Sequence, residues 1–226
     1  MRFIPGNFAM QIGFLGHASL LLTAGDGTTL LLDPYNAGGF EGRLAYAPIP
    51  HRADFVVCSH SHVDHCAIDT LPSPRPQVIE QGVAGPFRVS RLPVAHDEYG
   101  GRRRGGSVDI VRIDVDGLVL VHLSDVGQSP ESAIIEALGL IDVLFVPVGG
   151  FFTIGAAQAD EWSRRLQPAQ IVPIHYASAR CTLPIRPVDA FLAYGLPARF
   201  EPSGMIEITQ GLLSFSKQVV VLAPQL

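Results

Sequence analysis

The chain has 226 residues, of which 47% are hydrophobic and 16% charged, and its formal net charge at pH 7 is −5. This composition excludes a disordered chain and favours a globular fold, which we expect to be a single domain over residues 1–226. The only tight cluster of basic residues is Arg102-Arg103-Arg104. A broad basic surface is not indicated, so nucleic acid is not an expected partner. No apolar run could span a bilayer and residues 1–13 lack a signal-peptide pattern, which predicts a cytoplasmic protein without membrane contact.

The first half of the chain has the pattern of a β-sheet. Hairpins are expected around Gly25-Asp26-Gly27 and around Asp116-Gly117, because both turns lie between apolar stretches. Residues 35–53, rich in Gly, Pro and Ala, are expected to form a surface loop. The expected elements are strands at 19–22, 28–32, 55–58, 77–79, 87–94, 111–115 and 118–121, and a short helix at 67–71.

The second half mixes helices with strands. Ser129 and Pro130 suit the start of a helix that ends at Gly139, because serine caps a helix and proline fits its first turn. Residues 156–166 have the period of an amphipathic helix. The other expected elements are a helix at 187–194 and strands at 143–148, 171–174, 205–209 and 219–222.

One stretch stands out chemically: the run His60-Ser61-His62-Val63-Asp64-His65, directly after the strand expected at 55–58. Such a run would arise by chance on the order of one time in two thousand at this composition. Imidazole and carboxylate are ligands of zinc and similar divalent metals. His60 and His62 point to one side of an extended segment, and a turn would aim Asp64 and His65 at a neighbouring position. The run therefore predicts two adjacent metal sites, the alternative being a polar loop facing water.

Three more candidate ligands follow apolar runs that read as strands: His96, Asp125 and His175. A sheet brings strand ends side by side, and loops above a rigid sheet are common places for binding and catalysis. Asp125 could bridge two cations, and each histidine could complete one site. Taken alone, each histidine could equally be an ordinary surface residue.

The order and spacing of these residues resemble the ligand set of the metallo-β-lactamase superfamily. The segments Gly16-His17-Ala18, Leu32-Asp33-Pro34 and Pro173-Ile174-His175-Tyr176 are similar to its branch of small bacterial metal-dependent hydrolases, which includes ascorbate-6-phosphate lactonase. The resemblance implies a mixed α/β (α+β) fold, a four-layer αββα sandwich with two metals at one edge. The implied ligands are His60, His62 and His96 for the first metal, Asp64, His65 and His175 for the second, and Asp125 as a bridge.

The activity that the resemblance implies is metal-dependent hydrolysis. Two divalent ions, zinc first and manganese, iron or nickel as alternatives, would share a water, lower its pKa and supply hydroxide to cleave a small ester, lactone or phosphodiester. Asp64 would be both ligand and proton acceptor. His17 would either contact the substrate or leaving group, or bond to the Asp33 region and fasten two loops. Many relatives carry histidine where this chain has Gln128. A glutamine cannot take over proton transfer at this position.

Other features leave alternatives open. The arginine run is either a clamp for an anionic substrate or a solvated turn, and Phe151-Phe152 is either a cleft wall or, as we favour, part of the core. Cys58, Cys66 and Cys181 are expected to be reduced thiols, with Cys66 a candidate sulfur ligand. We expect His51 and His122 to lie outside the site. A non-catalytic metal-binding or ligand-sensing protein and a nucleic-acid-processing enzyme are the alternative functions, and self-association into a homo-oligomer is open.

Overall fold

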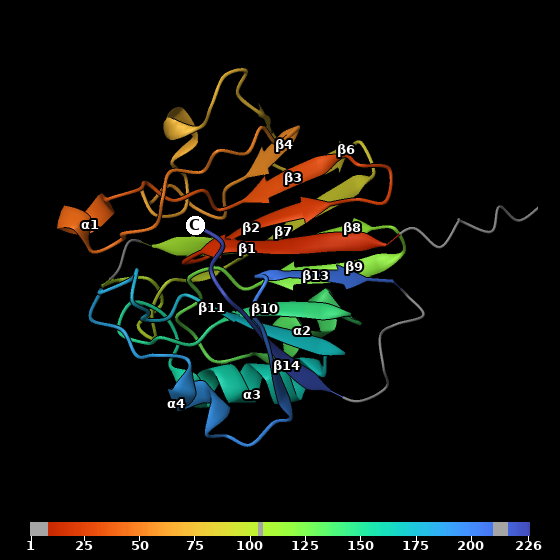
Figure 1. Ribbon diagram of the computed structural model, residues 1–226. Coiled ribbons are helices and arrows are strands. Elements are labelled where there is room, and N and C mark those ends of the chain that lie inside the picture. Colours follow the sequence, from red (N-terminus) through yellow and green to blue (C-terminus); the bar gives the residue numbers. More distant parts are fainter. Residues whose placement is uncertain (1–8, 104–105, 210–216) are drawn as a thin grey trace, which may run out of the picture.

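Two β-sheets lie face to face in the computed structural model, which describes residues 9–103, 106–209 and 217–226 (Figure 1). The six-stranded sheet has the order β13-β1-β2-β3-β4-β5, and the eight-stranded sheet has the order β12-β14-β11-β10-β9-β8-β7-β6. The strands are β1 Met10–Gly16, β2 Ser19–Thr23, β3 Thr29–Leu32, β4 Phe55–Val57, β5 Gln77–Val78, β6 Gly82–Ala84, β7 Phe87–Ala95, β8 Ser107–Val115, β9 Leu118–His122, β10 Val143–Pro147, β11 Gln170–Ile174, β12 Ala198–Glu201, β13 Met205–Ile208 and β14 Gln218–Leu222.

The main core lies between the two sheets and under the helices of the eight-stranded sheet. Strand β10 is buried along its whole length, because it is a central parallel strand covered on both faces. Strand β8, by contrast, alternates between buried and less buried positions over most of its length, as a strand with one solvated face does. The apolar pattern of each strand thus follows its place in the sheets.

The helices are distributed unequally over the two outer faces. Figure 1 shows α2 (Ser132–Leu138), α3 (Ala156–Leu166) and α4 (Asp189–Leu192) on the outer side of the eight-stranded sheet, where α3 buries Ala159 and Trp162. The outer face of the six-stranded sheet is covered by the 3-10 helix η1 (Ile68–Thr70) and by loops, which share a second apolar cluster with Leu31 and Val56. The single turn α1 (Gly39–Gly42) lies in one of these loops and has no buried residue. The predicted four-layer sandwich is therefore confirmed, with one thin outer layer.

Strand direction explains where a site can form. β1, β3 and β4 run the same way, and so do β9, β10 and β11. In Figure 1, β1 and β3 run toward the side of the molecule on which α1 lies. The loops that follow these strands meet at this edge between the sheets, which brings together segments separated by more than a hundred positions.

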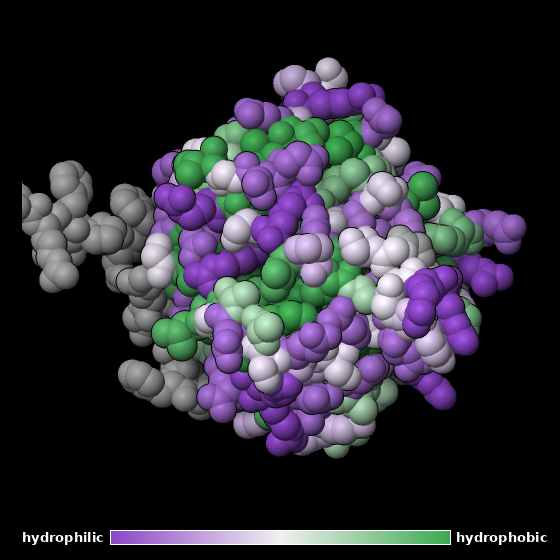
Figure 2. Space-filling view, turned by 180° about the vertical axis from the view of Figure 1, so that it is seen from behind, coloured by the Kyte–Doolittle hydropathy of each residue, from purple (hydrophilic) through white to green (hydrophobic). Residues whose placement is uncertain are grey.

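The surface mixes hydrophobic and hydrophilic residues. On the face shown in Figure 2, hydrophobic areas that extend over several residues lie between hydrophilic ones. Among the described residues, no helix is both long and apolar enough to cross a membrane.

The cysteine prediction was wrong for two of the three residues. Cys58 and Cys66 form a disulfide with a Cα–Cα distance of 5.2 Å, while Cys181 is a free, buried thiol. The two cysteines lack a C-x-x-C spacing, so the sequence showed no sign of a disulfide. The turn between them nevertheless brings Cys58, just after β4, next to Cys66. Cys66 is therefore not a sulfur ligand in this structure, and the disulfide encloses the loop that carries the histidine cluster.

Candidate metal centre

The loop His60–His65 begins where β4 ends and folds back in a tight turn. The backbone amides of His65 and Cys66 both donate to the carbonyl of His62, at 3.0 and 2.8 Å. This turn separates the directions of the side chains, as expected from the sequence. His60 and His62 face one position, and Asp64 and His65 face the next.

The first group of candidate ligands consists of His60, His62, His96 and Asp125, whose ligand atoms all lie within 4.8 Å of one another. His60 Nε2 is 3.0 Å from His62 Nδ1. His96 comes from the end of β7 and reaches within 3.7 Å of Asp125 Oδ2. Three imidazoles and one carboxylate oxygen at this spacing are a donor set that suits a zinc-like cation.

The second group consists of His17, Asp64, His65 and His175. All four are buried, and their ligand atoms also lie within 4.8 Å of one another. His17 lies just after β1 and His175 just after β11, and the His175 amide donates to the His17 carbonyl at 2.7 Å. Both residues have a positive φ, +55° and +51°, a conformation that is uncommon for residues other than glycine and is often found at functional sites.

Asp125 lies between the two groups and divides its oxygens between them. Its Oδ1 is 3.2 Å from His65 Nε2 and 3.6 Å from His175 Nε2. Its Oδ2 is 3.7 Å from His96 Nε2 and 3.9 Å from His60 Nε2. A carboxylate in this position can bridge two cations.

Several buried nitrogen atoms of the two groups lack partners. Within the described part of the chain, His65 Nε2, which faces Asp125, and both ring nitrogens of His96 have no hydrogen bond. A buried polar atom without a partner costs free energy, so native structures rarely leave such atoms unpaired. Divalent cations would satisfy nitrogen atoms of this kind, so the residues fit a metal centre.

The charges of the centre also favour cations. Burial would raise the pKa values of Asp64 and Asp125, but His65 beside them, with His17 for Asp64 and His175 for Asp125, holds both below the usual range. Burial lowers the pKa of His60 to about 4 and that of His175 to about 3. These two histidines are therefore neutral at pH 7, and the carboxylates are ionised. Metal ligands need these protonation states. His65 differs, because Asp125 and Asp64 overcome the effect of burial and raise its pKa well above the usual value, so a cation would have to displace its proton.

Asp33 orients part of the centre, and its role was not predicted. It lies directly after β3, where its Oδ1 accepts from the Ser59 amide at 2.7 Å and its Oδ2 from the Ser59 hydroxyl at 2.7 Å. Its Oδ2 also accepts from His65 Nδ1 at 2.9 Å. The Nε2 atom of His65 is thereby directed at the centre, as in the carboxylate–histidine–metal arrangement of many metal sites.

Ser59 extends this orientation to His60. Because the Ser59 hydroxyl donates to Asp33, its oxygen is free to accept from His60 Nδ1, 3.0 Å away, and from the Ser124 hydroxyl at 2.6 Å. The proton of His60 then lies on Nδ1, and the Nε2 lone pair faces the centre. Asp33, Ser59 and Ser124 come from three strand ends, and only the folded structure shows their contacts.

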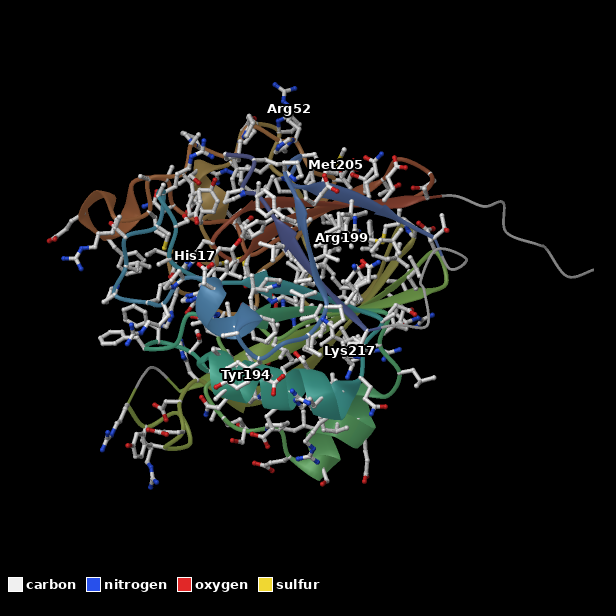
Figure 3. All side chains as sticks on the ribbon, turned by 60° about the horizontal axis from the view of Figure 1, so that its bottom comes forward. His17, Arg52, Tyr194, Arg199, Met205 and Lys217 are labelled. Carbon is white, nitrogen blue, oxygen red and sulfur yellow. A yellow bond between two sulfur atoms is a disulfide. The ribbon has the colours of Figure 1, made fainter. Side chains whose placement is uncertain are left out.

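His17 has a side-chain contact that neither alternative included. Its ring is 1% exposed, and Figure 3 shows it inside the molecule, in contrast to Arg52, which projects from the surface. Its Nε2 donates to Asp64 Oδ2 at 3.1 Å. His17 therefore contacts the candidate ligand Asp64 and not Asp33, while its backbone carbonyl fastens the His175 loop.

Gln128 and His122, which were not expected to act in the site, make structural contacts. Gln128 Oε1 accepts from the Ala95 amide at 2.6 Å, so Gln128 joins the end of β7 to the segment before α2. His122 donates from Nε2 to the Ala18 carbonyl and accepts at Nδ1 from the Ser124 amide. The prediction that His122 lies outside the site agrees with these contacts.

Two cavities lie at the centre and beside it. A cleft of about 440 Å³ is lined by candidate ligands and by Phe40, Ser61, Val63, Phe152 and Leu183. A neighbouring cavity of about 350 Å³ shares His96 and Phe152 with the cleft and contains Arg103.

The cavities decide the alternative for Phe151-Phe152 and place one residue of the arginine run. Phe151 is 60% exposed and lines the neighbouring cavity, and Phe152 lines both cavities, so core packing was wrong for Phe151 and incomplete for Phe152. Arg103 lies over the Tyr99 ring at 3.6 Å from its centroid. Arg104 lies outside the described residues.

Comparison with known proteins identifies the family. A family model described as a beta-lactamase superfamily domain matches residues 11–175. The chain belongs to the metallo-β-lactamase superfamily. The histidine cluster and all the other candidate ligands lie within the matched segment, so the family match and the geometry concern the same part of the molecule.

Relatives within this superfamily are named for hydrolysis. A UPF0173 metal-dependent hydrolase from Desulforamulus reducens is 27% identical over 196 residues, which cover 74% of this chain and 84% of the relative. Another from Methanoculleus marisnigri is 29% identical over 192 residues, covering 74% of this chain and 81% of the relative. A solved structure from Thermotoga maritima, described as a Zn-dependent hydrolase of the metallo-beta-lactamase superfamily, is 28% identical, with a TM-score of 0.72 and coverage of 94% and 97%.

These findings define the activity at a coarse level. The protein is a metal-dependent hydrolase of the metallo-β-lactamase superfamily, and its two histidine and aspartate groups are the residues that could hold metal. Its family favours a small-molecule substrate, and the cleft of about 440 Å³ has the size of a small-molecule site.

Proposed function

We propose that this protein holds two divalent metal ions and uses them to cleave a small ester, lactone or phosphodiester with water. The proposed ligands are His60, His62 and His96 for one ion, Asp64, His65 and His175 for the other, and Asp125 as the bridge. The position of Asp125 is the observation that carries the proposal, because its two oxygens face different histidine groups. A single site would need only one of these oxygens.

The metals and the chain divide the chemistry. When bound, the ions would supply a water that is acidic enough to attack at neutral pH and would polarise the scissile group. Asp64 stays ionised because of its histidine neighbours, which suits both its proposed roles, as a ligand and as acceptor of the proton of the attacking water. Asp33 and Ser59 hold the rings of His65 and His60 in the required orientation.

We propose that His17 acts through Asp64. Its hydrogen bond holds Asp64 Oδ2, the oxygen that also lies 3.6 Å from His65 Nε2 at the centre. Since His17 is buried, this contact supports a positioning role better than it supports contact with the substrate.

Zinc is the first choice of metal. Five imidazoles and two carboxylates suit zinc, although manganese, iron and nickel accept the same donors.

The direct test is a hydrolysis assay with ester, lactone and phosphodiester substrates after loading with each of these metals. Asp125→Asn should lower kcat by about a hundredfold or more, because the bridge loses a negative charge between the two sites. His51→Ala, in the loop before β4, is the matched control and should keep wild-type rates. A wild-type protein that hydrolyses nothing with any of the metals would refute the proposed function.

A further inference from the structure

The cleft above the candidate metal centre has a polar floor and largely apolar walls. The floor consists of candidate ligands, whereas the walls include four large apolar side chains: Phe40, Val63, Phe152 and Leu183. These four residues come from four separate segments, which follow β3, β4, β10 and β11. Loops that are distant in sequence therefore build one apolar wall around a polar floor.

Two of the wall residues are unusually exposed for apolar side chains. Phe40 is 42% exposed and Val63 is 56% exposed. Phe40 also has a φ of +53°, in the left-handed region that aromatic residues rarely adopt. Isolated exposed apolar residues are common, but several that converge on one concave site mark a binding surface.

The charges around the cleft argue against an anionic substrate group at the walls. Among the described lining residues of the cleft there is no lysine or arginine. The nearby arginine, Arg103, lines the neighbouring cavity and stacks on Tyr99. Away from the metals, an anion in the cleft would therefore lack a cationic partner and would lose its hydration against apolar side chains.

We propose that the cleft selects uncharged esters or lactones with an apolar acyl group, and that Phe40, Val63, Phe152 and Leu183 contact this group. The inference rests on the proposed function and narrows its substrate class to molecules whose group at the walls is uncharged and apolar. In the reaction, the oxygen of water bonds to the acyl carbon, the carbon–oxygen bond to the alcohol breaks, and a proton from the water goes to the departing alkoxide. The products are a carboxylic acid and an alcohol.

The first test is a chain-length series of p-nitrophenyl esters from acetate to hexanoate, with bis(p-nitrophenyl) phosphate beside it, using the metal-loaded protein. We expect kcat/KM to rise about fourfold for each added methylene, which corresponds to about 0.8 kcal/mol of burial. Leu183→Ala should weaken this dependence. Phe40→Asn is the second variant, because its side chain is partly exposed and asparagine tolerates a positive φ.

Two controls make the test specific. Leu140→Ala, at a position that is 91% exposed between α2 and β10, should leave the chain-length dependence unchanged. Arg103→Ala should leave ester hydrolysis unchanged as well. If the phosphodiester were the better substrate and Arg103→Ala lowered its kcat/KM, the inference would be overturned in favour of an anionic substrate.

A binding measurement separates this inference from the proposed function. The metal-free protein is titrated with methyl ketones from 2-butanone to 2-octanone, followed by NMR of the ligand, and Kd should fall about fourfold per methylene in the wild type but less in Phe40→Asn. Chain-length-dependent binding without any hydrolysis would refute the proposed function and keep the inference. Hydrolysis without chain-length dependence in either measurement would keep the function and refute the inference.

Discussion

At the scale of single residues, the centre depends on side chains that hold its ligands in place. Asp33 is fully buried and accepts three hydrogen bonds, two from Ser59 and one from His65. A carboxylate behind a ligand histidine fixes the tautomer and raises the basicity of the ring. Asp33 is therefore expected to affect metal binding without touching metal.

Asp33→Asn should lower metal affinity by about ten- to a hundredfold, the usual cost of losing such a partner. The amide can still accept from Ser59 but has lost the charge that steadies His65. Metal competition with a chromophoric chelator measures the change. Asp69→Asn, at a side chain that is 91% exposed, is the matched control and should bind like the wild type. Equal affinity of Asp33→Asn and wild type would show that His65 needs no orientation from Asp33.

The candidate ligands were easier to predict from the sequence than the residues that orient them. The seven proposed ligands could be selected because His60, His96, Asp125 and His175 each follow an apolar run, and the other three belong to the same cluster as His60. Ser59, Ser124 and the partner of His17 could not be selected in this way, because their roles depend on contacts between strand ends that local patterns do not encode. Asp33 gave a signal in Leu32-Asp33-Pro34, but its partner His65 is 32 positions away.

At the scale of elements, two loops approach each other closely at Gly127. A Cβ atom at this position would lie 2.3 Å from the Asp97 backbone and from the His96 carbonyl carbon. Gly127 follows Asp125 by two residues, and its amide donates to the Ala95 carbonyl at 2.9 Å. The loop of Asp125 is thereby packed against the loop of His96.

Gly127→Ala should push these loops apart and both destabilise the fold and weaken metal binding. A loss of about 2 kcal/mol or more is expected, in the range of severe steric substitutions. Urea unfolding measures the first effect and metal titration the second. Gly39→Ala, where the added atom would meet its neighbours at no less than 3.8 Å, serves as the control. A variant at Gly127 as stable as the control would contradict the close approach.

The disulfide gives a second prediction at this scale. Cys58 and Cys66 are 8 positions apart and enclose the histidine cluster. Closing a loop of this size stabilises the fold by about 2 kcal/mol through the entropy of the unfolded chain. The double variant Cys58→Ser/Cys66→Ser should lose about this much stability to urea. Added reductant should destabilise the wild type only, and an equal response in the double variant would argue against the bond.

The amphipathic helix was predictable, whereas the buried strand β1 and two short exposed strands were not. The helix expected at 156–166 has these bounds in the structure. The helix expected from Ser129 begins at Ser132, so Pro130 lies outside it. β6 and β12 were missed, because three or four residues with mostly exposed side chains give no apolar period. The single domain and the oligomeric state remain predictions.

At the scale of the whole molecule, the buried histidines link stability to pH. The pKa of His60 is lowered to about 4 and that of His175 to about 3, chiefly by burial. In the unfolded chain both rings take up a proton near pH 6.5. The unfolded state therefore binds more protons between about pH 6.5 and 4, and the free energy of unfolding falls as the pH is lowered through this window.

The metal-free protein should lose about 2 kcal/mol or more between pH 6.5 and 4.5, at about 1.4 kcal/mol per pKa unit. His65 acts in the opposite direction, but its raised pKa affects stability above pH 6.5 and does not cancel the loss. Urea unfolding after treatment with a chelator measures the slope, and His60→Asn should flatten it. A stability that stays constant or rises over this window would contradict the assignment of neutral, buried imidazoles.

The proposal of a two-metal centre is tested most directly by the metal content of the folded chain. The metal-free protein is titrated with zinc and analysed by plasma mass spectrometry after removal of free metal. We predict two ions per chain in the wild type and weaker binding at both sites in Asp125→Asn, because Asp125 faces both groups. A wild-type protein that retains one ion or none at saturation would contradict the two-metal centre.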